Sequence, residues 1–393
     1  MQRLRKLTSC SAACLALVSA SGLAQTFTVP NTFVSGTPAS AADVNANFSA
    51  TAAAVNGKQN LVAGTCPAGQ AIRAVNANGS VICQPLSFFG GDGSAGNLTV
   101  SANASWSATP PVNPNFANIV INNGQTLTVP AGTTIRCSGA FTNNGTLSVD
   151  PGAVSDGNFD ALSFLPAPSG FLTSVAHPGD TPGPATLGSQ DNTGNQALGG
   201  GQGGKAIPRA TAQTSFSNFR FGGGSGAGYD NQGNAGGGLV RIYCEGAIQN
   251  VGTINAQGQN GGNSTIAGGG GGIVVLASRS AVTNSGTINV AGGNGSGSAS
   301  WGGNGGGGGG GIVIMISPTA PVLGTANLAG GTGATSATAV AGVARTGGAG
   351  GGGSGGAGGA GGSVTSGGTP SNATNGGVGY SILMTLDPIS IAR

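Results

Sequence analysis

The chain has 393 residues, of which 81 are glycine, and only 6% of its residues are charged. Ordinary soluble domains contain about 7% glycine and about 25% charged residues. The glycines follow no Gly-X-Y period, which excludes collagen, and 38% hydrophobic residues can bury a core, which argues against a charge-swollen disordered chain. The sequence also lacks the basic patches typical of proteins that bind nucleic acids or membrane surfaces.

Residues 1–24 have the pattern of a secretory signal peptide. Three basic residues in the first six positions precede a short apolar segment at 10–18, and Gly22-Leu23-Ala24 fits a cleavage site before Gln25. The apolar segment is too short to span a bilayer, and no later segment is long enough, so we expect no transmembrane segment. Without these residues the chain has ten basic and ten acidic side chains, which predicts a nearly neutral exported protein.

Four cysteines remain after residue 24, namely Cys66, Cys83, Cys137 and Cys244. An even number in an exported chain indicates disulfides, for which three pairings exist. Asn78-Gly79 favours a hairpin turn between the first two cysteines, so we expect Cys66 to pair with Cys83 and Cys137 with Cys244. With no CxxC motif and one histidine in the chain, we expect neither a metal nor another cofactor.

Residues 25–60 predict an extended start followed by one short helix. Its apolar residues recur at helical spacing, at Val44, Phe48, Ala52 and Val55. Ser40 or Asp43 can cap its first turn. One apolar stripe needs a partner, either the rest of this chain or a second copy in a homo-oligomer.

The segment around this predicted helix resembles a known type of sequence. The phrases Asn31-Thr-Phe-Val-Ser-Gly-Thr-Pro and Ala42-Asp-Val-Asn-Ala-Asn-Phe are similar to the amino-terminal segment of exported bacterial proteins with fibre-like or repetitive bodies. This resemblance covers about 30 residues and implies no particular activity.

The chain becomes repetitive from about residue 88. An Asn-x-Gly-Thr phrase recurs, with variations, at residues 122–129, 143–149, 250–256, 284–290 and 324–328. The glycines of the first two copies lie 21 positions apart, and later spacings are 34 and 38. Periods of this length with short strands predict an all-β solenoid, a parallel β-helix with glycine-rich loops. We expect the glycine of each Asn-x-Gly turn to adopt a left-handed conformation.

The cysteines give a second indication of the stacking. Cys137 and Cys244 each lie eight residues before the glycine of their copy, so the coils at 130–150 and 237–256 are predicted to be neighbours. The expected organisation is a disulfide hairpin, first coils, an excursion and a glycine-rich solenoid, at residues 61–87, 88–150, 151–236 and 237–393.

Glycine is concentrated in the second half of the chain, where 58 of the 81 glycines follow residue 200. The longest runs lie at 268–272, 305–311 and 350–353. Two interpretations stay open: flexible linkers, or polyglycine-II helices that pack closely because glycine has no side chain.

Candidate catalytic groups are few. Asp150, Asp156 and Asp160 are the only dense group of acids, and His177 lies near Asp180 without an identifiable nucleophile. Aspartate beside glycine or proline is typical of turns, so we expect a non-catalytic protein.

Two further motifs also fail as functional signals. The glycine run before Lys205 lacks the Ser or Thr of a phosphate loop, because Ala206 stands there. Ice binding favours repeated Thr-x-Thr ladders, whereas Thr126 and Thr128 form such a pair once.

The second half resembles bacterial and phage surface proteins that combine β-helix coils with glycine loops, including tail-fibre adhesins. The resemblance rests on the Gly-Thr-Ile-Asn repeats and the glycine runs, and it implies a secreted structural or adhesive protein of the cell surface or extracellular matrix. Glycans or cell surfaces would be its partners, with Trp106 and Trp301 as sugar contacts unless they pack in the core. The alternatives are a β-helix polysaccharide lyase or hydrolase and a phage-like receptor-binding adhesin.

Overall fold

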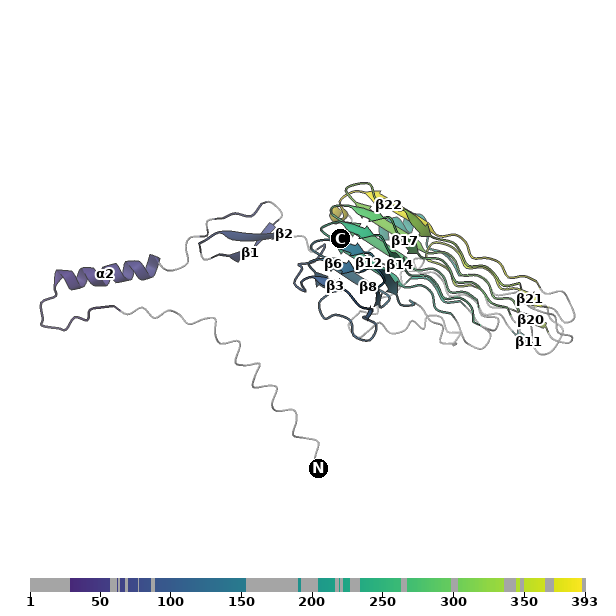
Figure 1. Cartoon of the computed structure of the whole chain (residues 1–393), viewed down its shortest axis with the longest axis horizontal. Helices are drawn as coiled ribbons and strands as arrows, with labels where there is room; N and C mark the ends of the chain where they lie inside the picture. Colours follow the sequence, from purple (N-terminus) through teal and green to yellow (C-terminus); the bar gives the residue numbers. More distant parts are fainter. Residues whose placement is uncertain are drawn as a thin grey trace, which may run out of the picture. The chain divides into compact units, whose positions relative to one another are not determined.

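The computed structural model divides into two units, Met1–Leu86 and Ser87–Arg393 (Figure 1). The described residues are 29–56, 62, 64–67, 70–76, 78–85, 89–152, 190–191, 204–215, 219, 222–226, 234–262, 267–297, 303–335, 344–346, 350–364 and 371–390. The expected signal peptide lies outside them. The described part of the chain is mostly β, with parallel sheets and few helices.

Helix α2 (Ala41–Asn56) lies in the first unit and is rich in alanine, the best helix former. Ser40 caps it, as expected, because its Oγ accepts a hydrogen bond from Asp43 N at 3.4 Å. Two further hydrogen bonds fasten the preceding segment to the helix: Asn31 N to Asn47 Oδ1 at 2.9 Å, and Asn47 Nδ2 to Asn31 O at 2.8 Å.

A two-stranded antiparallel hairpin follows in the same unit, formed by β1 (Gln70–Val75) and β2 (Val81–Pro85). Its turn contains Gly79 in the left-handed conformation, at φ 84°. Cys66 and Cys83 form a disulfide with 5.6 Å between their Cα atoms, which is the expected pairing.

The second unit contains three parallel sheets, here called sheets 1, 2 and 3. Sheet 1 consists of β4 (Ala104–Ser105), β7 (Thr126–Val129), β10 (Thr146–Val149), β14 (Thr253–Asn255), β17 (Thr287–Asn289) and β19 (Thr325–Asn327). Sheet 2 consists of β5 (Asn115–Phe116), β8 (Thr133–Cys137), β12 (Leu239–Cys244), β15 (Ile273–Ser278), β18 (Ile312–Ser317) and β22 (Tyr380–Thr385). Sheet 3 consists of β3 (Leu98–Val100), β6 (Ile119–Ile121), β9 (Phe141–Asn143), β13 (Ile248–Asn250) and β16 (Val282–Asn284).

Up to β18, successive strands of these sheets visit sheet 2, sheet 3 and sheet 1 in turn, so each circuit stacks on the one before. The next circuit meets sheet 3 through an isolated bridge between Val322 and Thr283. The strand pairs β8–β12, β9–β13 and β10–β14 join residues about a hundred positions apart in the chain. Cys137 and Cys244 face each other in this register and form the second disulfide, with 4.5 Å between their Cα atoms. The prediction that these two coils are neighbours is therefore confirmed.

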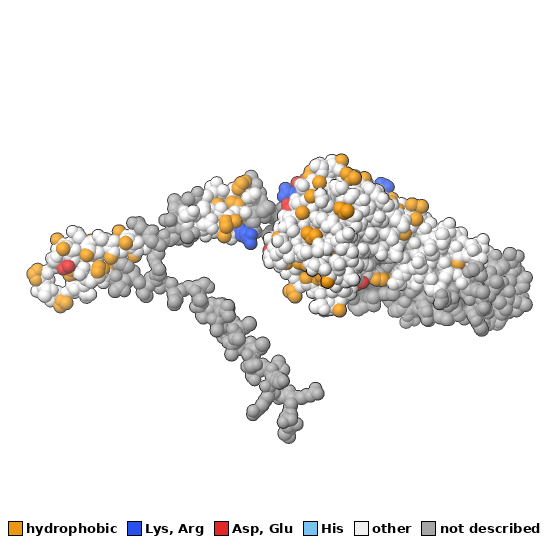
Figure 2. Space-filling model, in the orientation of Figure 1, with side chains coloured by type: hydrophobic (Ala, Val, Ile, Leu, Met, Phe, Trp, Pro, Cys, Tyr) orange, Lys and Arg blue, Asp and Glu red, His pale blue; other side chains and the backbone are white. Residues whose placement is uncertain are grey.

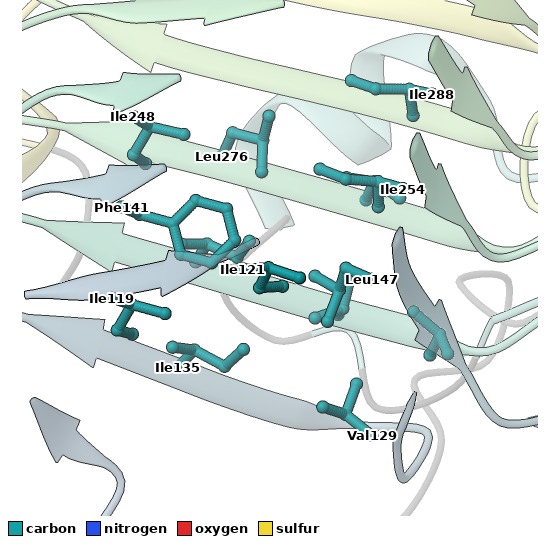
Figure 3. Packing of buried hydrophobic residues seen from close by; sticks show 14 of the residues in the cluster. Ile119, Ile121, Val129, Ile135, Phe141, Leu147, Ile248, Ile254, Leu276 and Ile288 are labelled. Atoms are coloured by element: carbon teal, nitrogen blue, oxygen red, sulfur yellow. The ribbon is translucent and has the colours of Figure 1, made fainter. Parts of the chain in front are cut away.

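The interior of the stack is apolar, because every strand sends alternate side chains inward. Figure 3 shows inward side chains from all three sheets meeting, among them Ile135, Phe141 and Leu147, and all three are fully buried. A second apolar layer lies on the outer side of sheet 2. There α3 (Arg209–Ser215) contributes Ala212, which packs with outward residues such as Ile314. The middle strands of sheet 2, β12, β15 and β18, are buried along their whole length, which explains the nearly continuous apolar runs of β15 and β18.

The later coils contain long glycine-rich runs between sheet 1 and sheet 2. Figure 1 shows runs extending away from the sheets toward a small antiparallel sheet of β11 (Gln190–Asp191), β20 (Ala344–Thr346) and β21 (Ser363–Val364). The described runs lie at residues 222–226, 234–238, 256–261, 267–272, 291–295, 304–311, 328–333, 350–362 and 373–379. A single short 3-10 helix, η2 (Pro388–Ser390), follows β22 in this part of the chain.

These runs are hydrogen-bonded to one another with a period of three residues. Gly268 N donates to Gly306 O at 2.9 Å, and Gly271 N donates to Gly309 O at 2.7 Å. The intervening donors point to other runs, as Gly270 N does to Gly224 O at 2.9 Å. The expected excursion at 151–236 therefore returns to the body, because its residues 222–226 form part of this glycine packing.

At many of their glycines the runs approach so closely that a side chain is excluded. A Cβ on Gly308 would overlap the carbonyl oxygen of Gly269, and three residues later a Cβ on Gly311 would overlap that of Gly272. The described parts of the runs are therefore packed main chain to main chain, and the linker interpretation does not describe them.

The corners of the stack differ from the sequence prediction in one respect. Gly124 (φ 75°) and Gly324 (φ 56°) are left-handed, but Gly145, Gly252 and Gly286 are not. These three glycines are needed for close approach instead, because a Cβ on Gly252 would overlap the carbonyl of Gly145, and one on Gly286 that of Gly252.

The coil repeat also differs from the 21-residue spacing of the first two glycines. Sheet 1 pairs Thr126 with Thr146, whereas sheet 3 pairs Ile121 with Asn143. The earlier corner is longer than the later one, so glycines that align in the sequence are not equivalent in the stack.

Candidate binding surface

The outer side of sheet 1 carries a column of threonines, called the threonine column below. Strand register places its members side by side on five neighbouring strands: Thr126, Thr146, Thr253, Thr287 and Thr325. Neighbouring strands lie about 4.8 Å apart, so the hydroxyl groups recur at about that interval. The Thr-x-Thr pair itself occurs once on these strands, as expected, at Thr126 and Thr128; the structure adds that its first threonine recurs across neighbouring strands.

A second polar column runs beside the first, two residues further along each strand. Its members are Thr128, Ser148, Asn255, Asn289 and Asn327. The amides fix one another, since Asn289 Nδ2 donates to Asn255 Oδ1 at 3.1 Å and to Gln257 Oε1 at 2.6 Å. Neither column contains a charged or aromatic residue.

Buried asparagines hold the corner that precedes these columns. Asn143, Asn250 and Asn284 stack in register and are fully buried. Asn143 Nδ2 donates to Asn250 Oδ1 and Asn250 Nδ2 donates to Asn284 Oδ1, both at 2.6 Å. Each also bonds a main-chain carbonyl, as Asn284 Nδ2 does with Thr325 O at 2.9 Å. This asparagine ladder fixes where β14, β17 and β19 begin, because its amides bond the carbonyls of Thr253, Thr287 and Thr325.

The copy at 250–254 shows what each residue of the Asn-x-Gly-Thr-Ile repeat does in the structure. Asn250 belongs to the buried ladder, Gly252 permits close stacking, Thr253 faces outward and Ile254 enters the core. The repeat therefore specifies both the interior of the stack and its polar outer face.

Trp106 lies at the beginning of the stack, just after β4. Its ring stacks on Phe116 with 6.0 Å between ring centroids, and it packs against the inner core. Its main-chain N donates to Thr128 O at 2.8 Å. These contacts give Trp106 a packing role, while Trp301 lies outside the described residues.

Of the acidic candidates, Asp150 is the one that lies among the described residues. Asp150 directly follows β10, and its main-chain N donates to Val129 O at 2.8 Å. Asp156, Asp160, His177 and Asp180 lie outside the described residues.

The closest ion pairs connect corners of the stack. Arg279 lies 3.0 Å from Glu245 and 3.6 Å from Asp387, and Glu245 Oε1 accepts a hydrogen bond from Gly90 N at 3.2 Å. Partial burial lowers the pKa of Arg279, but the hydrogen bond and charge of Glu245, with those of Asp387, raise it above its usual value. This arrangement joins successive coils to the end of the chain, which is a structural role.

A tyrosine fastens the outer layer to sheet 2. Tyr380 OH donates to Ile207 O at 2.8 Å, and Arg209 lies over its ring at 5.0 Å from the centroid. Burial raises the pKa of Tyr380 to about 12, although the positive charge of Arg209 opposes the shift. Burial likewise raises the pKa of Tyr243, whose ring stacks on Phe89.

Figure 2 shows that charged side chains are sparse on the visible side of the second unit. Among the described residues, no three His, Cys, Asp or Glu side chains cluster as metal ligands would. The same part of the chain contains no helix with the length and hydrophobicity needed to cross a bilayer.

Fold and surface together define a mostly β protein with parallel sheets and, on sheet 1, a polar and uncharged outer face. Comparison of the chain with protein-family models, with curated proteins and with solved structures finds no match.

Proposed function

We propose that the chain is a secreted, non-catalytic structural or adhesive protein of the cell surface or extracellular matrix. The observation that carries this proposal is the three-residue hydrogen-bonding period between glycine runs. It fixes distant segments to one another through main-chain groups, as from Gly268 to Gly306 and from Gly271 to Gly309. A body built in this way is a neutral and stiff support.

The finer architecture that fits these contacts is a parallel β-helix extended by polyglycine-II helices. The strand order of sheets 2, 3 and 1 supports a β-helix, because each circuit pairs in register with the next. Three residues per turn is the period of polyglycine-II, and glycine alone permits its close axial spacing.

Export is supported by two features of the chain. Both disulfides are compatible with an extracellular location, since thiols stay reduced in the cytosol. Residues 1–24 supply the signal-peptide pattern. Expression with the native amino terminus should therefore give an external protein that begins at Gln25, and amino-terminal sequencing checks this; an uncleaved protein inside the cell contradicts it.

We propose that the protein contacts glycans or cell surfaces through residues that connect two hydrogen-bonded glycine runs. Residues 298–302, which include Trp301, join the run at 291–295 to the run at 304–311. Both runs belong to the packed body, because Gly292 N donates to Ala329 O and Gly308 N donates to Gly293 O.

A binding experiment on immobilised mucin and peptidoglycan tests this contact. Trp301→Ala should lower binding without changing the unfolding midpoint, while Trp106→Phe, the matched control, should leave binding unchanged. Deletion of residues 291–310 is unsuitable because it removes packed glycines. Equal binding by the wild type and Trp301→Ala would exclude this surface.

A homo-oligomer through α2 is part of the same proposal. Phe48 is 70% exposed and Val55 63% exposed on this helix, which leaves its apolar stripe open within the described residues. Sedimentation should show an oligomer that Phe48→Ser dissociates, and a monomeric wild type would exclude it.

A further inference from the structure

The two columns of sheet 1 form a polar array that repeats in two directions. Across the strands the repeat is about 4.8 Å, and along each strand the step between the columns is about 6.7 Å. The array spans β7, β10, β14, β17 and β19, so its geometry comes from main-chain pairing rather than from mobile side chains.

The threonine column has hydroxyl groups available for a ligand. None of its five hydroxyls makes a hydrogen bond to another residue in the described part of the chain; only main-chain atoms of these threonines do so, as Thr126 N does with Asn103 Oδ1 at 2.9 Å. Each threonine also presents a methyl group. The column therefore alternates small apolar groups with groups that can donate and accept.

The backing of the array keeps it fixed. Beneath it lie fully buried residues of the same strands, such as Leu147, Ile254 and Ile288. The asparagine ladder holds the start of β14, β17 and β19, and Asn289 of the second column donates to Asn255. A surface that is already ordered loses little conformational entropy on binding, so many weak contacts can add up.

We propose that these two columns bind the surface of an ice crystal. An ice surface repeats in two directions, carries no net charge and offers donors and acceptors at every site, which complements a neutral array of hydroxyl and amide groups. A single soluble chain would follow one column and leave the other unused. Sugar surfaces are commonly contacted through aromatic rings, and neither column has one. The inference does not depend on the Trp301 contact proposed above.

The test uses the full secreted chain with both disulfides formed, labelled with a fluorophore at its amino terminus. Adsorption to a single growing ice crystal is measured against protein concentration. The wild type should coat the crystal, and Thr253→Leu/Thr287→Leu should need about tenfold more protein, equivalent to about 1.4 kcal/mol.

The matched control lies on sheet 3, with one residue in the coil of Thr287 and the other in the coil before that of Thr253. Thr142 and Thr283 also face outward there, but Val120 and Gln249 interrupt their column. Thr142→Leu/Thr283→Leu should adsorb like the wild type.

Circular dichroism and unfolding midpoints show that the variants are folded. If the leucine pair on sheet 1 unfolds, Thr253→Ser/Thr287→Ser, which removes only the methyl groups, should still weaken adsorption. The proposal is overturned if the wild type does not adsorb or if both sheets' variants lose adsorption equally. It is also overturned if the sheet 1 substitutions abolish binding to crystalline cellulose or chitin and not to ice.

Discussion

Asn143 donates its side-chain amide to Asn250 at 2.6 Å although 107 positions separate them in the chain. The contact is fully buried and continues to Asn284. It shows how the stack selects its register: a shift by one residue would place these amides outside and put a neighbour such as Gln249 or Val251 in the buried corner position.

Substitution in this ladder should be costly. Asn250→Ala leaves the buried Asn284 Oδ1 without its partner, so we expect the free energy of unfolding to fall by about 2–4 kcal/mol. Gln249→Ala, at the exposed neighbouring position, should change it by less than about 0.5 kcal/mol. Urea denaturation measures both, and equal effects would show that the ladder adds nothing.

The two disulfides should affect different units. Loss of the bridge between Cys137 and Cys244, by double substitution to alanine, should lower the stability of the second unit by about 2–5 kcal/mol. Loss of the bridge between Cys66 and Cys83 should leave that transition unchanged, because both residues lie in the first unit. Calorimetry distinguishes these results; a common shift would mean that the units unfold together.

Glycine packing can be tested with one methyl group. A Cβ on Gly308 would overlap the carbonyl of Gly269, so Gly308→Ala should destabilise the second unit by about 3 kcal/mol. The nearest atom to a Cβ on Gly377 is 3.2 Å away, and Gly377→Ala should cost less than about 1 kcal/mol. Thermal unfolding compares the two, and similar losses would contradict close packing at Gly308.

Stability should decrease in alkaline solution because of Tyr380. Its pKa rises from 10.0 to about 12 in the folded protein, so its contribution is complete below pH 10 and is lost as pH rises toward about 12. Tyr380→Phe should cost about 1 kcal/mol at neutral pH, through loss of the bond to Ile207 O.

The pH dependence distinguishes this role from simple packing. Tyr380→Phe should flatten the alkaline decrease in the free energy of unfolding, and Tyr243, whose pKa is also raised, should account for part of what remains. Urea titrations across this range provide the measurement. An unchanged alkaline slope in the variant would contradict the assignment.

Much of the fold could be predicted from sequence because the relevant signals are local. The alternation around Leu147, the caps of α2 and the spacing of Cys137 and Cys244 from their glycines depend on neighbouring residues. These signals predict strands, a helix and paired coils.

The register of the earliest coils could not be predicted from the sequence. Nor could the sequence show whether a given glycine is required for a left-handed conformation or for close packing. Gly124 and Gly145 align in the sequence, but one is left-handed in open space while the other touches the preceding corner. Corner length decides the difference, and it becomes visible only when the strands are paired.

The sequence by itself therefore determined a parallel, glycine-rich repeat with two specific disulfides, because periodicity and cysteine spacing are properties of one strand or one turn. Only the tertiary structure decided that one column is formed by Thr126, Thr146, Thr253, Thr287 and Thr325. It also decided that the glycine runs are hydrogen-bonded to one another with a period of three residues. Both features arise between segments far apart in the chain. Main-chain hydrogen bonds set the distance between these segments, and that distance does not depend on the length of the loop between them.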